Sequence, residues 1–239
     1  AEYYQESKIL KTLGKTKIIT SDKYILEGSN ITIDNQNDLI RSKENSILTD
    51  LDGNTIFLEN FEYQISENIF KSVGFVKIDD NKKNSLEFSQ IYIDTKKNEI
   101  IGSDIKAFMN DENFKISEKN KPRVFANSFN SNKEKSTFIK SIFTLCDYRE
   151  NDKCPPWSIQ SSKMLHDSKK KTIYYDNAVI KVYDVPIFYI PRLSHPDPSV
   201  ERRSGFLPPS ISDTKNLGES VSVPYFFDIA KNKNFTLTN

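Results

Sequence analysis

The sequence predicts an all-β protein, and two observations carry this prediction. First, short runs of β-branched and aromatic residues alternate with polar turns from Thr16 to Met109, and runs such as Phe61–Ile65 show the period of two that is typical of a strand with one buried face. Second, Ala178–Leu207 contains four prolines, whose fixed φ and missing amide donors exclude a helix there. A helix could form only in Ala1–Leu13, where the apolar pattern is poor.

The expected strands are separated by polar turns in which Asn, Asp and Lys stand in for glycine, which occurs only 7 times. The expected turn centres are Gln36, Glu44, Asp52, Glu67, Asn81, Lys97 and Asp111. The expected strands of this half are Tyr24–Asp34, Leu39–Ser42, Ser46–Leu51, Thr55–Ile65, Ile69–Ile78, Leu86–Asp94 and Glu99–Met109. Further along, we expect loops around one or two strands in Asn113–Asn132, a strand at Ser136–Leu145, a polar loop at Cys146–Pro156, and strands at Trp157–Gln160 and Ile173–Tyr183.

A weak internal repeat of strand, Asp, short polar turn and strand occurs three times. Its copies begin with Ile31–Asp34, Ile91–Asp94 and Met164–Asp167. Repeated units of hairpin size stack into a quasi-one-dimensional β structure, although chance similarity among hairpins is the alternative with only three copies.

Length and charge narrow the class of protein. The chain has 239 residues, and 34 Lys and Arg against 33 Asp and Glu leave a formal charge of +1, which gives no argument for nucleic acid as a partner. A hydrophobic content of 36% and a mean hydropathy of -0.59 predict an elongated domain with a large polar surface. No apolar run approaches the ~20 residues of a transmembrane helix, and the start at Ala1 is what a processed secreted protein would show.

Catalytic motifs are missing from the sequence: there is no nucleophile elbow, no phosphate-binding loop and no zinc-protease motif. His166 is expected to be an exposed turn residue, and His195 has no assignable nucleophile or orienting acid. Asp34, Asp79 and Asp94 occupy turn positions, where Asp bonds its own backbone. Neither His has a Cys at ligand spacing. We therefore expect no enzyme activity, no metal and no cofactor.

The two cysteines, Cys146 and Cys154, lie eight residues apart in a polar stretch. A disulfide in an oxidising compartment is favoured over two surface thiols.

Along each strand one parity is apolar and the other polar. Two arrangements place the same residues inside: a closed sandwich core, or a sandwich held open so that its inner faces line a groove for an acyl chain. Periodicity cannot separate them. The inward positions that would line such a groove are Ile31, Ile33, Phe61, Tyr63, Ile65, Ile91, Ile93 and Ile105.

Five ordered motifs within Cys154–Asn239 resemble the family of LPS-assembly proteins LptD, the outer-membrane translocons for lipopolysaccharide. They are CPPWSI at 154–159, DVPIFYIP at 184–191, SHPDP at 194–198, RRSGFL at 202–207, and VPYFF at 223–227 followed by Ala230. The N-terminal repeats look like the OstA-type β-jellyroll that this family shares with periplasmic bridge proteins.

The resemblance implies a division of the chain and a function. Residues 1–15 would be an N-terminal extension, 16–198 a periplasmic jellyroll built as an open V-shaped stack of antiparallel hairpins, and 199–239 a linker with the first strands of an outer-membrane β-barrel, whose remainder is missing here. The jellyroll would receive lipopolysaccharide from a periplasmic bridge protein by edge-strand pairing within Thr16–Leu26 and pass its acyl chains to the barrel. Further implied partners are the outer membrane, reached through the barrel, and a lipoprotein plug of the barrel.

Two further expectations follow from the resemblance. Pro209 and Pro224 match prolines that weaken the first barrel strands and form a lateral gate, with Pro208 as an extra neighbour; proline cannot donate to a strand ladder. Cys146 and Cys154 would pair with each other or, in a longer protein, with cysteines of the barrel. The alternative from a different class is an extracytoplasmic β-sandwich scaffold with a closed core that binds protein partners only.

Overall fold

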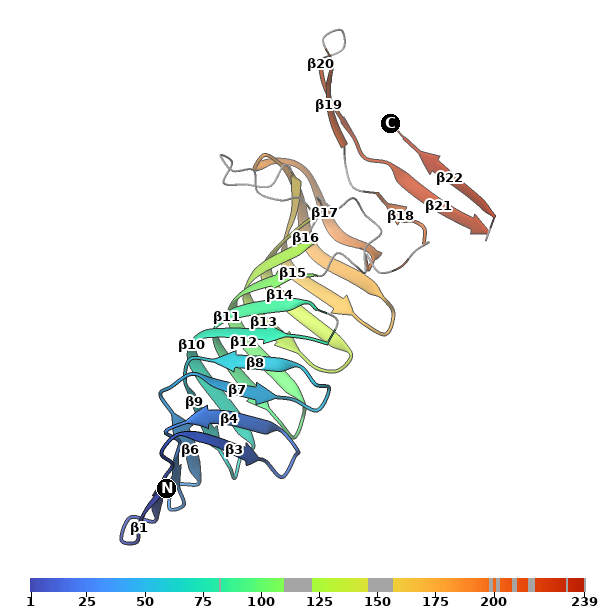
Figure 1. Ribbon diagram of the computed structural model, residues 1–239. Helices are drawn as coiled ribbons and strands as arrows, with labels where there is room; N and C mark the ends of the chain where they lie inside the picture. The colour runs from blue at the N-terminus through green and yellow to red at the C-terminus, as the bar shows by residue number, and fades with distance from the viewer. Residues whose placement is uncertain are drawn as a thin grey trace.

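The computed structural model describes residues 1–81, 83–109, 122–145, 157–197, 200, 203–207, 210–214, 218–230 and 232–238. These residues form strands β1 to β22 and contain no helix. The strands stack into an elongated body, with β1 (Glu2–Tyr4) near one end and the strands that follow β17 at the other (Figure 1). The predicted all-β class is confirmed.

Two walls of antiparallel strands form the N-terminal half. The first wall contains β1 and then, in order of pairing, β2 (Ile9–Lys11), β5 (Thr32–Asp34), β6 (Leu39–Ser42) and β9 (Phe61–Gln64). The second wall contains β3 (Lys15–Ile19), β4 (Ile25–Ser29), β7 (Ser46–Thr49) and β8 (Thr55–Leu58). The chain therefore changes wall after every hairpin, which is how a short-strand sequence builds both faces of one core.

Strand β10 (Ile69–Asp79) joins the two walls. Its first residues pair with β9 and its last residues pair with β8, while a register shift between Val73 and Val76 lets the strand bend in between. Gly74 occupies this bend with a φ of 126°, a conformation that side chains rarely adopt. From here on, single long strands cross both walls.

These long strands follow one another in sequence, each antiparallel to the last. They are β11 (Ser85–Asp94), β12 (Glu99–Phe108), β13 (Arg123–Ser131), β14 (Lys135–Thr144), β15 (Trp157–Asp167), β16 (Thr172–Val182) and β17 (Val185–Pro196). Asp104, Lys140 and Asn177 have φ values of 52°, 52° and 53° in the middle of β12, β14 and β16. Every second long strand therefore continues the bend that Gly74 begins.

Tight turns close the hairpins at a regular interval. Their left-handed residues are spaced 15 residues apart, and they are Lys8, Lys23, Asp38, Gly53, Asn68, Lys83 and Asn98. Asp side chains brace these turns: the Asp50 carboxylate accepts the amides of Asp52 and Asn54 at 2.9 and 2.8 Å. The interval equals one crossing of both walls plus one turn, so alternate turns lie at the free edges of opposite walls.

The remaining strands follow the jellyroll. Strand β18 (Gly205–Phe206) pairs with β21 (Tyr225–Ala230), which pairs with β22 (Lys233–Leu237), and β19 (Ser210–Thr214) forms a separate hairpin with β20 (Gly218–Ser222).

Several sequence-based expectations change in detail. Ala1–Leu13 forms β1 and β2 rather than a helix, because both strands find pairing partners in the first wall. The expected strands Tyr24–Asp34 and Thr55–Ile65 are each divided in two, because the chain crosses between walls there, at Asn30 with a φ of 51° in the first case. The turn at Asp111 and the loop Cys146–Pro156 lie outside the described residues.

Candidate functional site: the apolar interior of the jellyroll

A row of apolar side chains lies on the inner face of the second wall and crosses all of its strands. The pairing register places these residues side by side from one strand to the next: Ile18, Leu26, Leu48, Ile56, Ile78, Leu86, Ala107, Val124, Phe143, Ile159, Ile180 and Phe188. The first wall faces it with a second row of Leu10, Ile33, Ile40, Tyr63, Phe70, Ile93 and Ile100. The interior is therefore apolar from the N-terminal edge to the last jellyroll strand.

One row of the first wall becomes polar in the C-terminal half. After Ile100 the same row continues with Ser131, Ser136 and His166. The hydroxyls of Ser131 and Ser136 bond each other at 2.8 Å, so the two polar side chains satisfy one another. The row beside it on the first wall stays apolar and buried, through Phe129, Phe138, Met164, Tyr175 and Leu193. Both walls therefore keep the interior apolar in the C-terminal half.

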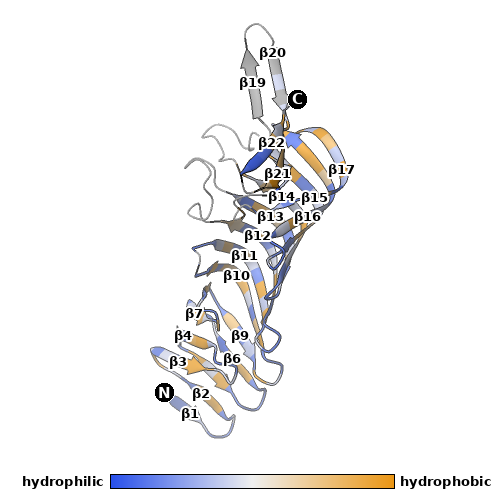
Figure 2. Cartoon of the chain, turned by 90° about the vertical axis from the view of Figure 1, so that its right-hand side faces the viewer, coloured by the Kyte–Doolittle hydropathy of each residue, from blue (hydrophilic) through white to orange (hydrophobic). Residues whose placement is uncertain are grey.

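The interior is packed along most of its length and opens at its C-terminal end. Leu26, Leu48 and Ile56 are fully buried between the walls. By contrast, Phe188 at the end of the same row is 50% exposed, and Ile180 is only partly covered. Hydrophobic residues are visible on β15, β16 and β17 near this end (Figure 2). The exposed end of an otherwise continuous apolar row is where an apolar ligand would meet the interior first.

Most of the residues predicted to line a groove lie inside the jellyroll. Six are at most 3% exposed: Ile31, Phe61, Tyr63, Ile91, Ile93 and Ile105. Ile33 is partly buried and packs against the core, whereas Ile65 is 37% exposed in the turn after β9. The side chains of the first group contact other core residues, and the Tyr63 ring stacks on Phe70 with centroids 4.1 Å apart. A lipid chain would reach them only where the two walls separate.

Sequence reasoning missed the row of the second wall. The apolar parity of strands such as β8 and β14 was visible in the sequence, but nothing local indicates that Ile56 and Phe143 share one row. That placement depends on the 15-residue interval of the turns, and this interval was the one signal from which the row could have been found.

Four residues bridge the free edges of the two walls, and we call them the latch: Asp22, Tyr24, Thr95 and Asn98. Thr95 donates its hydroxyl to the Asp22 carboxylate at 2.9 Å, and Tyr24 donates its hydroxyl to the Asn98 side-chain oxygen at 3.1 Å. Tyr24 and Thr95 are buried. Burial, followed by the nearby carboxylates of Asp50, Asp52, Asp22 and Asp94, raises the pKa of Tyr24 to about 12, so its phenol is a lasting donor. The latch holds the walls together near the N-terminal end.

The two histidines have structural partners. His195 lies in the core beside Tyr175, and burial lowers the pKa of its imidazole, which keeps the ring neutral. Its Nδ1 bonds the Pro196 carbonyl at 2.7 Å, and its Nε2 accepts from the Tyr175 hydroxyl at 2.9 Å. The expectation that His166 is an exposed turn residue is wrong: it lies in β15, partly buried, and pairs with Asp197. Strand pairing extends β15 past the polar residues from which a turn was inferred.

Of the other predicted residues, only Pro224 can be located. It lies between β20 and β21, where its carbonyl accepts the Leu207 amide at 2.9 Å. Pro209, Cys146 and Cys154 are outside the described residues. Among the described residues, no cluster of three potential metal-ligating side chains occurs, and no helix is long and apolar enough to cross a membrane.

Comparison with known proteins identifies relatives for less than half of the chain. No family model matches. The chain is 38% identical over 105 residues to the LPS-assembly protein LptD of Burkholderia cenocepacia (strain HI2424), and this match covers 44% of the chain and 13% of the relative. The LptD proteins of Paraburkholderia xenovorans (strain LB400) and Yersinia pestis bv. Antiqua (strain Antiqua) are 39% and 36% identical over 105 and 103 residues, again 13% of each relative.

The names of these relatives describe LPS assembly. The match spans about one eighth of their length. The relatives carry the family name that the sequence motifs resemble, and the architecture of the chain is all-β. The chain is an LptD-like protein.

Proposed function

We propose that this chain takes part in lipopolysaccharide transport and assembly at the outer membrane by carrying the acyl chains of the lipid. The observation that carries this proposal is the apolar row from Ile18 to Phe188, which is continuous across the second wall and exposed at its C-terminal end. Each side chain of the row that contacts lipid instead of water contributes about 1.5–3 kcal/mol, so several of them would retain an acyl chain where the walls separate. The predicted residues of the first wall, Ile33, Tyr63 and Ile93, would form the opposite side of the same path.

The C-terminal strands support a membrane-embedded continuation at 199–239. One face of the β21–β22 hairpin is apolar, since its alternating residues are Tyr225, Phe227, Ile229, Phe235 and Leu237. The other face includes Asp228, Asn234 and Thr236. This dyad pattern is typical of barrel strands that face lipid on one side. In this proposal Pro209 and Pro224 are gate residues, and a lipoprotein plug would be a partner of the complete barrel.

The dock for a periplasmic bridge protein is proposed at β3. Among the described strands, β3 pairs with β4 alone, so its outer edge is a template for strand addition. Ile19 and the nearby Leu13 are 65% and 67% exposed. Ile25, by contrast, lies between β3 and β7 and cannot belong to the edge.

The proposed disulfide between Cys146 and Cys154 is independent of the lipid path. A bridge over so short a loop contributes only ~2–3 kcal/mol, so its role would be in assembly rather than bulk stability. Alkylation and mass spectrometry of protein taken from the periplasm should find both sulfurs oxidised.

Photocrosslinking tests the lipid path. A photoreactive residue at Ile33, Tyr63 or Ile93 on the first wall, and at Leu48 or Phe143 on the second, should capture lipopolysaccharide in cells. Matched outward positions on the same strands, Thr32 and Glu62, are the controls. Each variant is first checked for a cooperative thermal transition, because the inward sites belong to the core.

Capture at the inward positions alone supports the lipid path. Equal capture at Thr32 and Glu62 contradicts it, since an outward position faces away from the apolar rows. Capture of proteins but no lipid at any position, in variants that fold, would favour the scaffold with a closed core instead.

A further inference from the structure

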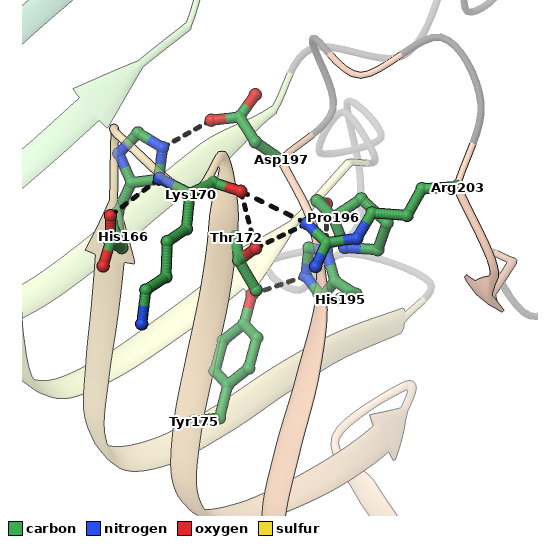
Figure 3. Close-up of polar contacts among 9 residues, drawn as sticks. His166, Lys170, Thr172, Tyr175, His195, Pro196, Asp197 and Arg203 are labelled. Atoms are coloured by element: carbon green, nitrogen blue, oxygen red, sulfur yellow. Dashed lines mark hydrogen bonds and ion pairs between the residues drawn. The ribbon is translucent and has the colours of Figure 1, made fainter.

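The chain leaves the jellyroll at Asp197, and this residue is held in two ways. Its amide donates to the Lys171 carbonyl at 2.9 Å, and its carboxylate pairs with Nε2 of His166. Both side chains of that pair are mostly buried. Figure 3 shows the pair beside the turn that connects β15 to β16. The first residue after β17 is thus fixed to the body of the jellyroll.

Arg203 forms a second anchor on the same turn. Its Nη1 donates to the Lys170 carbonyl at 3.2 Å and to the Thr172 hydroxyl at 2.7 Å (Figure 3). Thr172 is buried and donates its own hydroxyl to the Lys170 carbonyl at 2.9 Å, while the Asp167 carboxylate accepts the Lys170 amide at 2.8 Å. The receiving turn is therefore braced from within, and Arg203 binds a preformed pair of oxygens.

The strands after the linker begin directly at this anchor. Ser204, next to Arg203, accepts the amide of Asp228 in β21 at 2.9 Å. Gly205 pairs with Phe226 and lies against Pro196, where an added Cβ would be only 3.0 Å from the proline ring. The contacts of Arg203 on one side and of Ser204 and Gly205 on the other tie β18 and β21 to the end of β17.

The ring of His195 makes the jellyroll side of this contact rigid. Because its Nδ1 bonds the Pro196 carbonyl and its Nε2 accepts from Tyr175, the last residue of β17 is connected to a fully buried side chain. The centroids of the Tyr175 and His195 rings are 5.4 Å apart.

We propose that His166, Asp197 and Arg203 form a two-point joint that fixes the orientation of the C-terminal strands relative to the open end of the jellyroll. Two anchors on one turn restrict rotation as well as separation, which a single contact cannot do. The three are positioning residues. They touch no lipid, but they determine the position of β18, β21 and β22 relative to Phe188, where an acyl chain would leave the jellyroll. The role of the joint in lipid exit rests on the proposed function, whereas the contacts that form the joint do not.

Distance measurement by electron spin resonance tests the joint without lipid. Spin labels are placed on the whole chain at Tyr174, exposed on β16, and at Asn234, exposed on β22, after Cys146→Ser and Cys154→Ser. The protein is studied in detergent micelles. We expect one narrow distance distribution, loss of the narrow peak in Arg203→Ala, and partial recovery in Arg203→Lys, which keeps one charged donor but not the guanidinium geometry.

The matched control is Lys170→Ala. The joint uses the backbone carbonyl of Lys170 and not its side chain, so this variant should keep the narrow peak. The thermal midpoint of the jellyroll should be unchanged in Arg203→Ala, because Arg203 is exposed.

Two results would overturn the joint: a narrow peak that persists in Arg203→Ala, or a broad distribution accompanied by a lowered jellyroll midpoint, which would mean that Arg203 only stabilises the fold. Neither result bears on whether the interior carries lipid, which the crosslinking experiment decides separately.

Discussion

Gly102 shows at the scale of one residue how closely the core is packed. It lies in β12 on the inner face, and a Cβ added there would be 2.4 Å from Cδ1 of Phe88. Phe88 is buried and packs against Phe129 with ring centroids 5.5 Å apart. The phenyl ring therefore occupies the volume that any other residue at position 102 would need.

We predict that Gly102→Ala lowers the free energy of unfolding by about 1–3 kcal/mol, because the ring of Phe88 must shift within a filled core. Urea denaturation followed by fluorescence measures the change. Lys106→Ala, on the exposed face of the same strand, is the matched control and should stay within about 0.5 kcal/mol of the parent. Equal stability of the two variants would mean that the core has room which the structure does not show.

Tyr24 predicts a pH dependence of stability. Its pKa is raised from 10.0 to about 12 in the folded protein, chiefly by burial. The folded state therefore keeps the phenol proton that the unfolded chain loses above pH 10. The stability from this residue is fully present below pH 10 and is lost as the pH rises toward 12.

Chemical denaturation at a series of pH values from 8 to 12 (about two units on either side of the ordinary tyrosine pKa) measures this loss. Tyr24→Phe should make the decline with pH shallower, while the exposed Tyr174→Phe should leave it unchanged. Parallel declines in the parent and in Tyr24→Phe would contradict the assignment.

At the scale of elements, hydrogen bonds within the turns explain which strand boundaries were predictable from the sequence. Asp34, Asp94 and Asp167 of the sequence repeat each accept a backbone amide of the following turn, so the repeat reports a real local structure. The left-handed positions of these turns are filled by Lys, Asp, Gly or Asn with no common residue type. The regular interval is therefore visible only in the spacing of the turns and not in a residue motif, because exposed turn positions accept several residues.

The proposed gate also belongs to this scale. In the proposed gate, Pro209 and Pro224 would each withhold one donor from the seam of the barrel, a net loss of about 0.5–1.5 kcal/mol. Replacing both with Ala in the full-length protein should tighten the seam of the barrel and slow lipopolysaccharide export. The thermal midpoint of the jellyroll should not move. Normal export combined with a lowered midpoint would mean that the two prolines only shape local turns.

At the scale of the whole molecule, the two ends of the interior differ: the latch closes it near the N-terminal end, and it is open at the C-terminal end. The walls are bridged at Asp22, Tyr24, Thr95 and Asn98 near the N-terminal end, whereas the row ends half-exposed at Phe188. If lipid passes between the walls, the latch must open while the C-terminal end needs no such step.

We therefore predict that a short covalent cross-link between cysteines introduced at Asp22 and Thr95 blocks passage. In a Cys146→Ser, Cys154→Ser background, treatment with a bismaleimide should reduce lipid capture at Tyr63, while the same treatment of either single-cysteine variant should not. Undiminished capture in the cross-linked protein would show that lipid enters without separating the walls at this point.

The sequence by itself determined the all-β class, the positions of most turns and the inward parity of the strands, because these depend on local propensity and on a period of two. It also contained the motifs that resemble those of LptD proteins. It could not determine that Ala1–Leu13 forms strands or that His166 extends β15, because in both places a neighbouring strand supplies the hydrogen bonds that local propensity does not.

Only the tertiary structure decided how the strands are shared between the two walls. Ile56 and Phe143 enter one row, and Asp22 meets Thr95, although these residues are far apart in the chain. Such contacts depend on where each long strand bends and on how many residues separate successive turns. Bends at Gly74, Asp104, Lys140 and Asn177 place the second half of each strand on the other wall, and no residue pattern within a single strand encodes that placement.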